Sequence, residues 1–243
     1  MNIGVVIRTI GERTEALCRE SIERHIKPLI VSNISPHSLA TLTMYRLAHQ
    51  HPKDWYVFVD ADVVLVDGWY KLVQKHLGGL VKHNLIAPRN YDFIQDSRRM
   101  KGVKFYKGQF ISKCLHNMEA YYNESLRQLK PEDWALRKLD HKVGKFPRKI
   151  LFGYHGCEQY YIHIFNMYAR LYHTNKRMAR RQIGNLSHGD RRMAVRGWKY
   201  GAENKVDSKD FKKYVKIKGE KKPCELTLNE FYSIYSKYAE RRH

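Results

Sequence analysis

Cysteine is scarce in this sequence: the chain of 243 residues contains four, and no two of them stand at CxxC spacing. Such scattered cysteines exclude a knot-like disulfide framework and are typical of reduced thiols in the cytosol. Long apolar runs are also missing, since no window approaches the roughly 18 residues that a membrane span needs. The amino-terminal residues lack a basic segment followed by a long apolar stretch, so no signal peptide is predicted. We therefore expect a cytoplasmic protein without a transmembrane segment.

Acidic residues are few relative to basic ones: 24 Asp and Glu stand against 45 Lys and Arg, which gives a formal net charge of +21. A charge of this sign favours polyanionic partners, namely nucleic acid, an acidic membrane surface or phosphorylated small molecules. The alternative is a solubility feature or a compositional bias of the source organism. A hydrophobic fraction of 43% and an aromatic fraction of 12% exclude a disordered tail, and the length suits one domain with at most a small appendage.

The amino-terminal part alternates between two kinds of apolar pattern. Short β-branched or aromatic runs at residues 3–7, 29–31 and 55–59 predict buried strands, and the segments between them have helical spacing. The order strand, helix, strand, helix, strand predicts parallel strands with covering helices. Right-handed crossovers place the carboxyl ends of these strands at one edge of the sheet, where ligands bind in such folds.

The remaining elements complete the expected fold class. We expect strands at residues 85–87 and 105–112, the latter containing Gly108, and helices at 69–76, 114–140, 160–172 and 226–242, the second of them interrupted by Pro131. Thr227 is the expected N-cap of the last helix, with Glu230 three residues further on. The sequence therefore predicts an α/β protein with a mixed, mostly parallel sheet flanked by helices and with a helical, basic carboxyl-terminal part.

Two acidic residues follow the third strand directly. Asp60 and Asp62 flank a single small residue, Ala61, at the end of a run of apolar and aromatic residues. Carboxylates at this spacing beyond a strand end can share one Mg²⁺ or Mn²⁺, which usually keeps waters or substrate phosphates among its ligands. The cation then bridges to a diphosphate. The alternative is a pair of surface acids at a strand-to-loop turn, but the βαβαβ context favours the metal–diphosphate site.

The segments from Val5 to Arg13 and from Trp55 to Asp62 resemble the opening loop and the nucleotide-sugar strand of family 2-like glycosyltransferases, which have the GT-A fold. The resemblance covers about the first hundred residues. It implies a UDP-sugar donor and a nucleotide-sugar site formed by Arg8, Thr9, Gly11, Glu12, Asn33, Asp60 and Ala61. The family often has proline and aspartate where Arg8 and Asn33 stand. Residues 1–112 would be the nucleotide-sugar-binding half, 113–198 the acceptor-side half and 199–243 a basic extension.

The stretch from Gly153 to Gln159 resembles the glycine–glutamate element that precedes a helix in several GT-A families. A carboxylate there can accept hydrogen bonds from sugar hydroxyls or take the acceptor proton as a general base. Gln159 stands where many relatives have an acid and cannot take a proton, so Glu158 is the candidate base and, with Asp62, a candidate catalytic residue. The alternative is a carboxylate that only favours the helix dipole. The inverting and the retaining course both stay open.

Two further patterns also fit the resemblance. The turn from Leu186 to Arg192 resembles the late metal-binding histidine of several GT-A enzymes, with His188 as a third metal ligand and Arg191 beside the diphosphate. The alternative for His188, one of 13 histidines, is a structural or solvated side chain. Gly108 and Gln109 fit a family pattern in which a glycine-containing strand lines the junction of donor and acceptor.

The carboxyl-terminal part is the most basic, since residues 170–243 contain 20 Lys and Arg and 8 Asp and Glu, with aromatic residues between them. Basic side chains and stacking rings are typical of nucleic-acid surfaces. Some viral glycosyltransferases modify 5-hydroxymethylcytosine, and this resemblance implies a double-stranded DNA acceptor and a host cytoplasm. Two alternatives are a transferase for a bacterial surface glycan or lipid-linked acceptor, docked on anionic lipid, and a non-catalytic nucleic-acid-binding protein.

Overall fold

The computed structural model describes residues 1–34, 37–94, 97–124, 135–136, 138–139, 143–184, 186–204 and 219–240. Its centre is a six-stranded sheet in the order β2 (Leu29–Ser32), β1 (Ile3–Thr9), β3 (Trp55–Asp60), β8 (Val103–Lys107), β5 (Leu85–Ala87) and β9 (Gly144–Lys145). Strand β8 is antiparallel to β3 and β5, whereas the other neighbouring pairs are parallel. The predicted mixed, mostly parallel sheet is therefore confirmed.

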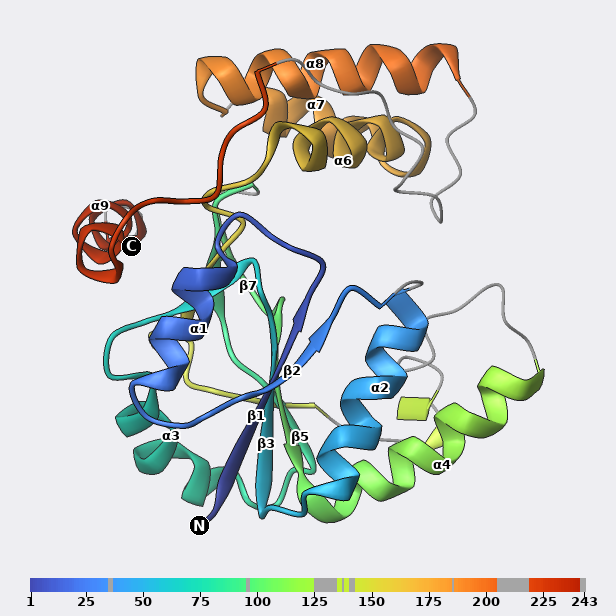
Figure 1. Ribbon diagram of the computed structural model, residues 1–243, viewed down its shortest axis with the longest axis vertical. Helices are drawn as coiled ribbons and strands as arrows, with labels where there is room; N and C mark the ends of the chain where they lie inside the picture. Colours follow the sequence, from blue (N-terminus) through green and yellow to red (C-terminus); the bar gives the residue numbers. More distant parts are fainter. Residues whose placement is uncertain are drawn as a thin grey trace.

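Helices cover both faces of this sheet (Figure 1). Helices α1 (Glu15–Glu23) and α3 (Trp69–Leu77), the latter followed by the short η1 (Gly78–Leu80), lie on one face, and α2 (His37–Gln50) and α4 (Gly108–Glu124) lie on the other. The alternation of side chains along each strand explains the two layers, because successive residues point to opposite faces. In β1, Val5 and Ile7 belong to the core under α1 and α3, whereas Val6 belongs to the core under α2 and α4.

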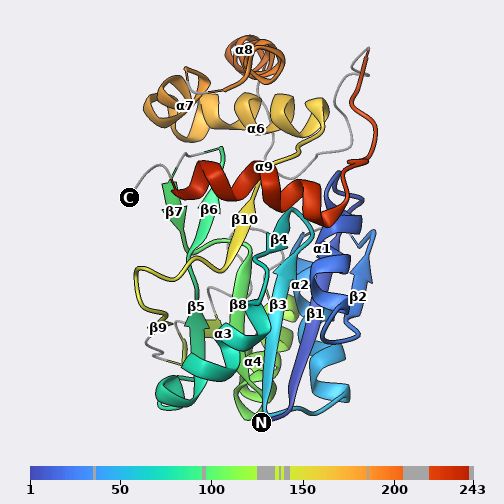
Figure 2. The ribbon, with the colours of Figure 1, turned by 90° about the vertical axis from the view of Figure 1, so that its left-hand side faces the viewer.

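A second sheet of four short strands continues from the carboxyl end of β3. Its order is β4 (Val63–Leu65), β10 (Gly153–His155), β6 (Asn90–Asp92) and β7 (Ser97–Arg99). The last helix, α9 (Leu228–Glu240), packs across it, as Figure 2 shows, with Leu228 and Phe231 fully buried. Thr227 and Glu230 form the expected capping box: the Thr227 N–H donates to the Glu230 carboxylate at 2.8 Å, and the Glu230 N–H donates to Thr227 Oγ1 at 3.3 Å.

A layer of three helices lies beyond the carboxyl ends of β1, β2 and β3 (Figures 1 and 2). It consists of α6 (Tyr161–Thr174), α7 (Lys176–Ile183) and α8 (His188–Glu203), and α6 confirms the helix predicted at residues 160–172. Helices α6 and α8 run parallel and very close to each other. A Cβ at Gly197 would overlap the carbonyl oxygen of Phe165, and a Cβ at Gly201 would overlap that of Ala169, so only glycine allows this approach. Helix α8 continues across the expected boundary at residue 198.

The strand predicted at residues 105–112 is wrong beyond Lys107, because Gly108 begins α4. The Gly108 N–H donates to Asp54 O at 2.9 Å, and a Cβ at Gly108 would overlap Lys53 O, so the backbone turns into the helix at a close crossing. The helix predicted at 114–140 therefore begins earlier, and its expected interruption at Pro131 lies outside the described residues. Among the residues that the structure describes, no helix has the length and apolar character of a membrane span.

Candidate functional site

The backbone of residues 60–62 is the point where several loops meet. Four hydrogen bonds tie it to segments far away in the sequence: Ala61 N to Arg8 O at 3.0 Å, Thr14 Oγ1 to Ala61 O at 3.0 Å, Asp60 N to Gly102 O at 2.8 Å and Gly156 N to Asp62 O at 3.0 Å. Arg8 lies in β1, whereas Thr14, Gly102 and Gly156 lie in the loops after β1, before β8 and after β10, so one strand and three loops hold this short segment. The two carboxylates are thereby fixed at the carboxyl end of β3, as the sequence predicted.

Asp60 is paired with a guanidinium from the neighbouring strand. Arg8 lies beside Asp60 in the parallel register of β1 and β3, and its guanidinium donates to Asp60 Oδ1 and, at 2.8 Å, to Thr41 Oγ1. Burial raises the pKa of Asp60, although the Arg8 charge opposes this shift. The arginine therefore orients the first carboxylate and keeps an ion pair at the site.

Asp62 belongs to a row of alternating charges. His155 Nε2 lies 3.2 Å from Asp62 Oδ2, and His155 Nδ1 lies 3.5 Å from Asp92 Oδ2. Burial alone would raise the pKa of Asp62, but the imidazolium outweighs it, so the pKa is lowered. Burial opposes the charged form of His155, but Asp62 and Asp92 outweigh it and raise the pKa of this ring to about 10. The ring is therefore an imidazolium at neutral pH.

Asp60 and Asp62 can hold a divalent cation. Asp62 Oδ1 is buried and has no hydrogen-bond partner among the described residues, and such an unpartnered carboxylate oxygen suits a hard cation. Within the described parts of the chain, no three His, Cys, Asp or Glu side chains form a metal-binding group. Mg²⁺, however, is usually bound by one or two carboxylates together with substrate phosphates, so two carboxylates match the number of protein ligands that such an ion takes.

The loop after β1 is ordered by its own polar side chains. Thr9 Oγ1 lies 2.7 Å from Glu12 Oε2 and 2.6 Å from Glu15 Oε2, and Gly11 has a φ of 83° that favours glycine. Burial raises the pKa of Glu12, against hydrogen bonds from Thr9 and from the Ile10 N–H. The loop expected to contact the nucleoside is therefore compact and rich in oxygen acceptors.

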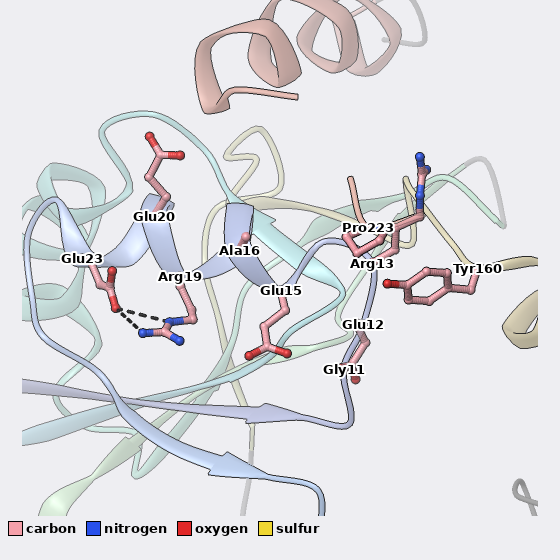
Figure 3. Close-up of a pocket in the computed structure, with 10 residues that line it drawn as sticks. All are labelled: Gly11, Glu12, Arg13, Glu15, Ala16, Arg19, Glu20, Glu23, Tyr160 and Pro223. Carbon is pink, nitrogen blue, oxygen red and sulfur yellow. Dashed lines mark hydrogen bonds and ion pairs between the residues drawn. The ribbon is translucent and has the colours of Figure 1, made fainter. Parts of the chain in front are cut away.

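An open cavity of about 530 Å³ begins at this loop and runs along α1 (Figure 3). Its lining residues are Gly11, Glu12, Arg13, Glu15, Ala16, Arg19, Glu20, Glu23, Tyr160 and Pro223. Tyr160 stands just before α6 and points toward the loop that carries Gly11 and Arg13. The cavity thus joins the end of β1 to the start of the helical layer.

Glu158 is engaged on both carboxylate oxygens. Arg13 forms an ion pair with its Oε2, and the Tyr235 hydroxyl of α9 donates to its Oε1. The Arg13 and Glu158 side chains are 17% and 19% exposed. Arg13 Nε also donates to Lys222 O at 2.6 Å, so this group joins the loop after β1 to the carboxyl-terminal segment. Both oxygens of Glu158 are therefore engaged in contacts within the fold.

The other predicted site residues lie at different places. Asn33 adopts a left-handed φ of 55° after β2, and its N–H donates to Thr9 O at 3.0 Å, which brings it to the expected edge. Gly108 and Gln109 lie at the opposite edge, beside the start of β3, and are not brought to the site. Arg191 is exposed and donates to the carbonyl oxygen of Ile183 at 3.2 Å.

The placement of the predicted metal ligand His188 is known only for the backbone. His188 is the first residue of α8, whose start packs beside that of α6, because a Cβ at Gly189 would approach the Tyr161 hydroxyl at 2.7 Å. The His188 side chain lies outside what the structure describes. Its role as a third ligand therefore stays a prediction.

Three residues near the site were missed by the sequence reasoning. His155 and Asp92 lie on different strands of the second sheet, and His163 lies on α6. Burial lowers the pKa of His163, whereas the charges of Glu220 and Asp62 act in the opposite direction, so this ring lies within electrostatic reach of the site. His155 stands inside the Gly153–Gln159 stretch, so the sequence did draw attention to its neighbourhood. Asp92 and His163 lie in no motif, and nothing in the sequence pointed to them.

Comparisons with known proteins do not assign this chain to a family. No family model matches the chain, and no curated protein matches it. Among solved structures, A197 from STIV is 12% identical with a TM-score of 0.48, covering 65% of this chain and 87% of that one. A glycosyltransferase involved in glycosylation of the major capsid of PBCV-1 is 12% identical with a TM-score of 0.43, covering 65% and 93%. S. aureus TarS is 10% identical with a TM-score of 0.41, covering 89% and 76%. Similarities at this level do not transfer a function.

Proposed function

We propose that this protein is a metal-dependent glycosyltransferase that moves a sugar from a UDP-sugar to an acceptor hydroxyl, with 5-hydroxymethylcytosine in DNA as the acceptor. The observation that carries the proposal is the convergence of three loops on residues 60–62, where Asp62 keeps a buried oxygen without a partner among the described residues. The carboxyl ends of parallel strands are the usual ligand-binding edge of α/β sheets.

The residues of this edge have separate tasks in the proposal. Glu12 accepts hydrogen bonds from the nucleoside, and Thr9, which is 2% exposed, holds the Glu12 carboxylate in place within the compact loop after β1. Arg8 orients Asp60, and Asp60 and Asp62 hold Mn²⁺ or Mg²⁺. When bound, such a cation neutralises charge on the departing nucleoside diphosphate. Ala61, whose N–H and carbonyl oxygen are both bonded within the fold, keeps the two carboxylates in place at this edge.

The proposal has two courses for the acceptor proton, one with Glu158 as the base and one without a strong base. Glu158 is the candidate from the sequence, and it lies beside the cavity through its ion pair with Arg13. Because Arg13 and Tyr235 engage both of its oxygens, proton transfer to Glu158 would compete with these two contacts. A front-side course without a strong base involves no such competition.

Charge supports DNA as the acceptor. Every Lys and Arg of α7 and α8 is exposed, and Asp190, an acid in the first turn of α8, is paired with Lys221 at 2.6 Å. Exposed basic side chains on rigid helices attract a phosphate backbone and make binding depend on salt concentration. The lipid-linked acceptor would use the same charge, so the acceptor itself must be tested.

The experiment supplies UDP-glucose, other UDP-sugars and Mn²⁺ with DNA that contains 5-hydroxymethylcytosine, followed by mass spectrometry of the nucleosides. We expect the mass of one sugar to be added to the modified nucleoside. The matched substrate is the same DNA with cytosine, which should stay unchanged. Transfer to a glycolipid with no change in the DNA would overturn the acceptor and leave the transferase.

The matched protein control is Asp62→Asn, which keeps the size of the side chain and removes its charge. We expect this variant to lose both transfer and hydrolysis of the UDP-sugar. A variant that keeps both activities would overturn the enzyme proposal itself. DNA binding that weakens steeply with salt, without any use of the donor, would indicate a binding protein instead.

A further inference from the structure

A row of charged side chains crosses from the second sheet into the candidate site. Lys101 Nζ lies 3.1 Å from Asp92 Oδ2, His155 Nδ1 lies 3.5 Å from the same oxygen, and His155 Nε2 lies 3.2 Å from Asp62 Oδ2. Asp92 is 1% exposed, and the Ile94 N–H donates to its Oδ1 at 3.0 Å. The row therefore begins at the exposed Lys101, passes through a fixed, buried carboxylate and ends on Asp62.

The strand register, and not chance contact, places the ring of His155. In the parallel pairing of β10 with β6, His155 stands directly beside Asp92. In the antiparallel pairing of β10 with β4, it stands beside Val63, the residue after Asp62. A Cβ at Gly102, which has a φ of 70°, would meet the ring of His155 at 3.3 Å, so the backbone turn at Gly102 also packs against this ring. The ring has little freedom to leave Asp62.

The two oxygens of Asp62 consequently differ. Oδ2 accepts from His155 Nε2, whereas Oδ1 is buried without a partner among the described residues. A carboxylate held on one oxygen cannot rotate freely, so its second oxygen keeps a fixed direction. Residues that fix a metal-binding side chain in this way contribute about 10–100-fold to metal affinity in known metal sites.

We propose that His155 is a positioning residue for Asp62: it holds Oδ2 so that Oδ1 is left for the cation–diphosphate of the donor. The inference rests on the proposed function, because it concerns the same metal–donor site. His155 itself contacts neither the donor nor the reacting atoms in this scheme, and the charge of Asp92, 3.5 Å from Nδ1 without a hydrogen bond, attracts the ring from behind. The sequence resemblance assigns no role to either residue.

The test measures UDP binding by isothermal titration calorimetry, with and without Mn²⁺, to the full chain. We expect His155→Leu to weaken UDP binding in the presence of Mn²⁺ by about 10–100-fold and to leave metal-free UDP binding unchanged. His155→Gln should stay within about threefold of the wild type, because its amide N–H can donate to Asp62 Oδ2 in place of the ring. A purely structural role would lower both kinds of binding together.

Circular dichroism melting shows whether each variant folds. If His155→Leu does not fold, Asp92→Asn replaces it, since this change keeps the ring and weakens its support; we then expect a selective loss of Mn²⁺-dependent UDP affinity of about threefold or more. Equal affinity of the wild type and the folded variant overturns the inference and leaves the proposed function standing. A wild type that does not bind UDP overturns the proposed function, and the inference with it.

Discussion

The role of Glu158 can be decided by one substitution, Glu158→Gln, which keeps the shape of the side chain and removes its charge. In the structure both carboxylate oxygens are engaged, one by the Arg13 guanidinium and the other by the Tyr235 hydroxyl. These contacts join the loop after β1, the start of the helical layer and α9. We therefore expect the substitution to destabilise the fold rather than to abolish the chemistry.

The size of the effect follows from burial. Breaking a fully buried ion pair costs about 3–5 kcal/mol, whereas an exposed pair is worth about 0.2–1 kcal/mol. Arg13 and Glu158 are 17% and 19% exposed, so we expect a cost between these limits, about 2 kcal/mol. For a chain of this length, 1 kcal/mol shifts the melting temperature by about 2–4 °C, which gives a decrease of about 4–8 °C.

The assay combines thermal unfolding with the initial rate of the proposed sugar transfer per amount of folded protein. Tyr235→Phe is the matched control, since it removes one hydroxyl from the same carboxylate and should cost about 1 kcal/mol. A general base typically contributes about 10²–10⁴-fold, so its loss would be obvious in the rate. A Glu158→Gln variant with the wild-type melting temperature and a rate lowered by about 10²-fold or more would refute our reasoning and establish Glu158 as the base.

Three further outcomes are expected. Gly197→Ala should lower the free energy of unfolding, measured in urea, by about 1–3 kcal/mol, because the new Cβ meets the backbone of α6. In the control Gly189→Ala the new Cβ meets only the hydroxyl end of a tyrosine, so the loss should be less than half as large. Gly108→Ala should destabilise by a similar amount without changing UDP affinity, and a selective loss of affinity would contradict a purely structural role for this glycine. The raised pKa of His155 should stabilise the metal-free protein fully below its unfolded value of 6.5, and this contribution should be lost as the pH rises through about 10. Urea titrations in EDTA at several pH values, compared with His155→Gln, measure it; parallel curves for the two proteins would disprove it.

The central part of the fold could be predicted from the sequence because its signals are local. Strands β1 and β3 are continuous apolar runs, and the helices between them have a clear helical period. The capping box of α9 also needs only two residues that stand three positions apart. The position of Asp60 and Asp62 at the sheet edge followed from these local signals and from the handedness of βαβ units.

The second sheet could not be predicted in the same way. Each of its strands β4, β6, β7 and β10 has three residues, too few to show a period. The pairing of β10 with β4 joins residues about ninety positions apart, and only this pairing brings His155 to Asp62. Gly108 was predicted in a strand for a related reason. Its apolar neighbours suit a strand, whereas the start of α4 at Gly108 depends on a close approach to the Lys53 carbonyl, which is a tertiary contact.

The geometry of α8 bears on how a polyanion could meet the site. Gly197 faces α6, and at about 100° per residue Arg192 and Lys199 lie about 140° and 160° around the helix from it. Both side chains are exposed, and α6 lies between α8 and the sheet in both views (Figures 1 and 2). The basic face of α8 is therefore directed away from Asp62. DNA bound there would be tethered without being presented to the donor, so contacts outside α8 would have to deliver a base to the site.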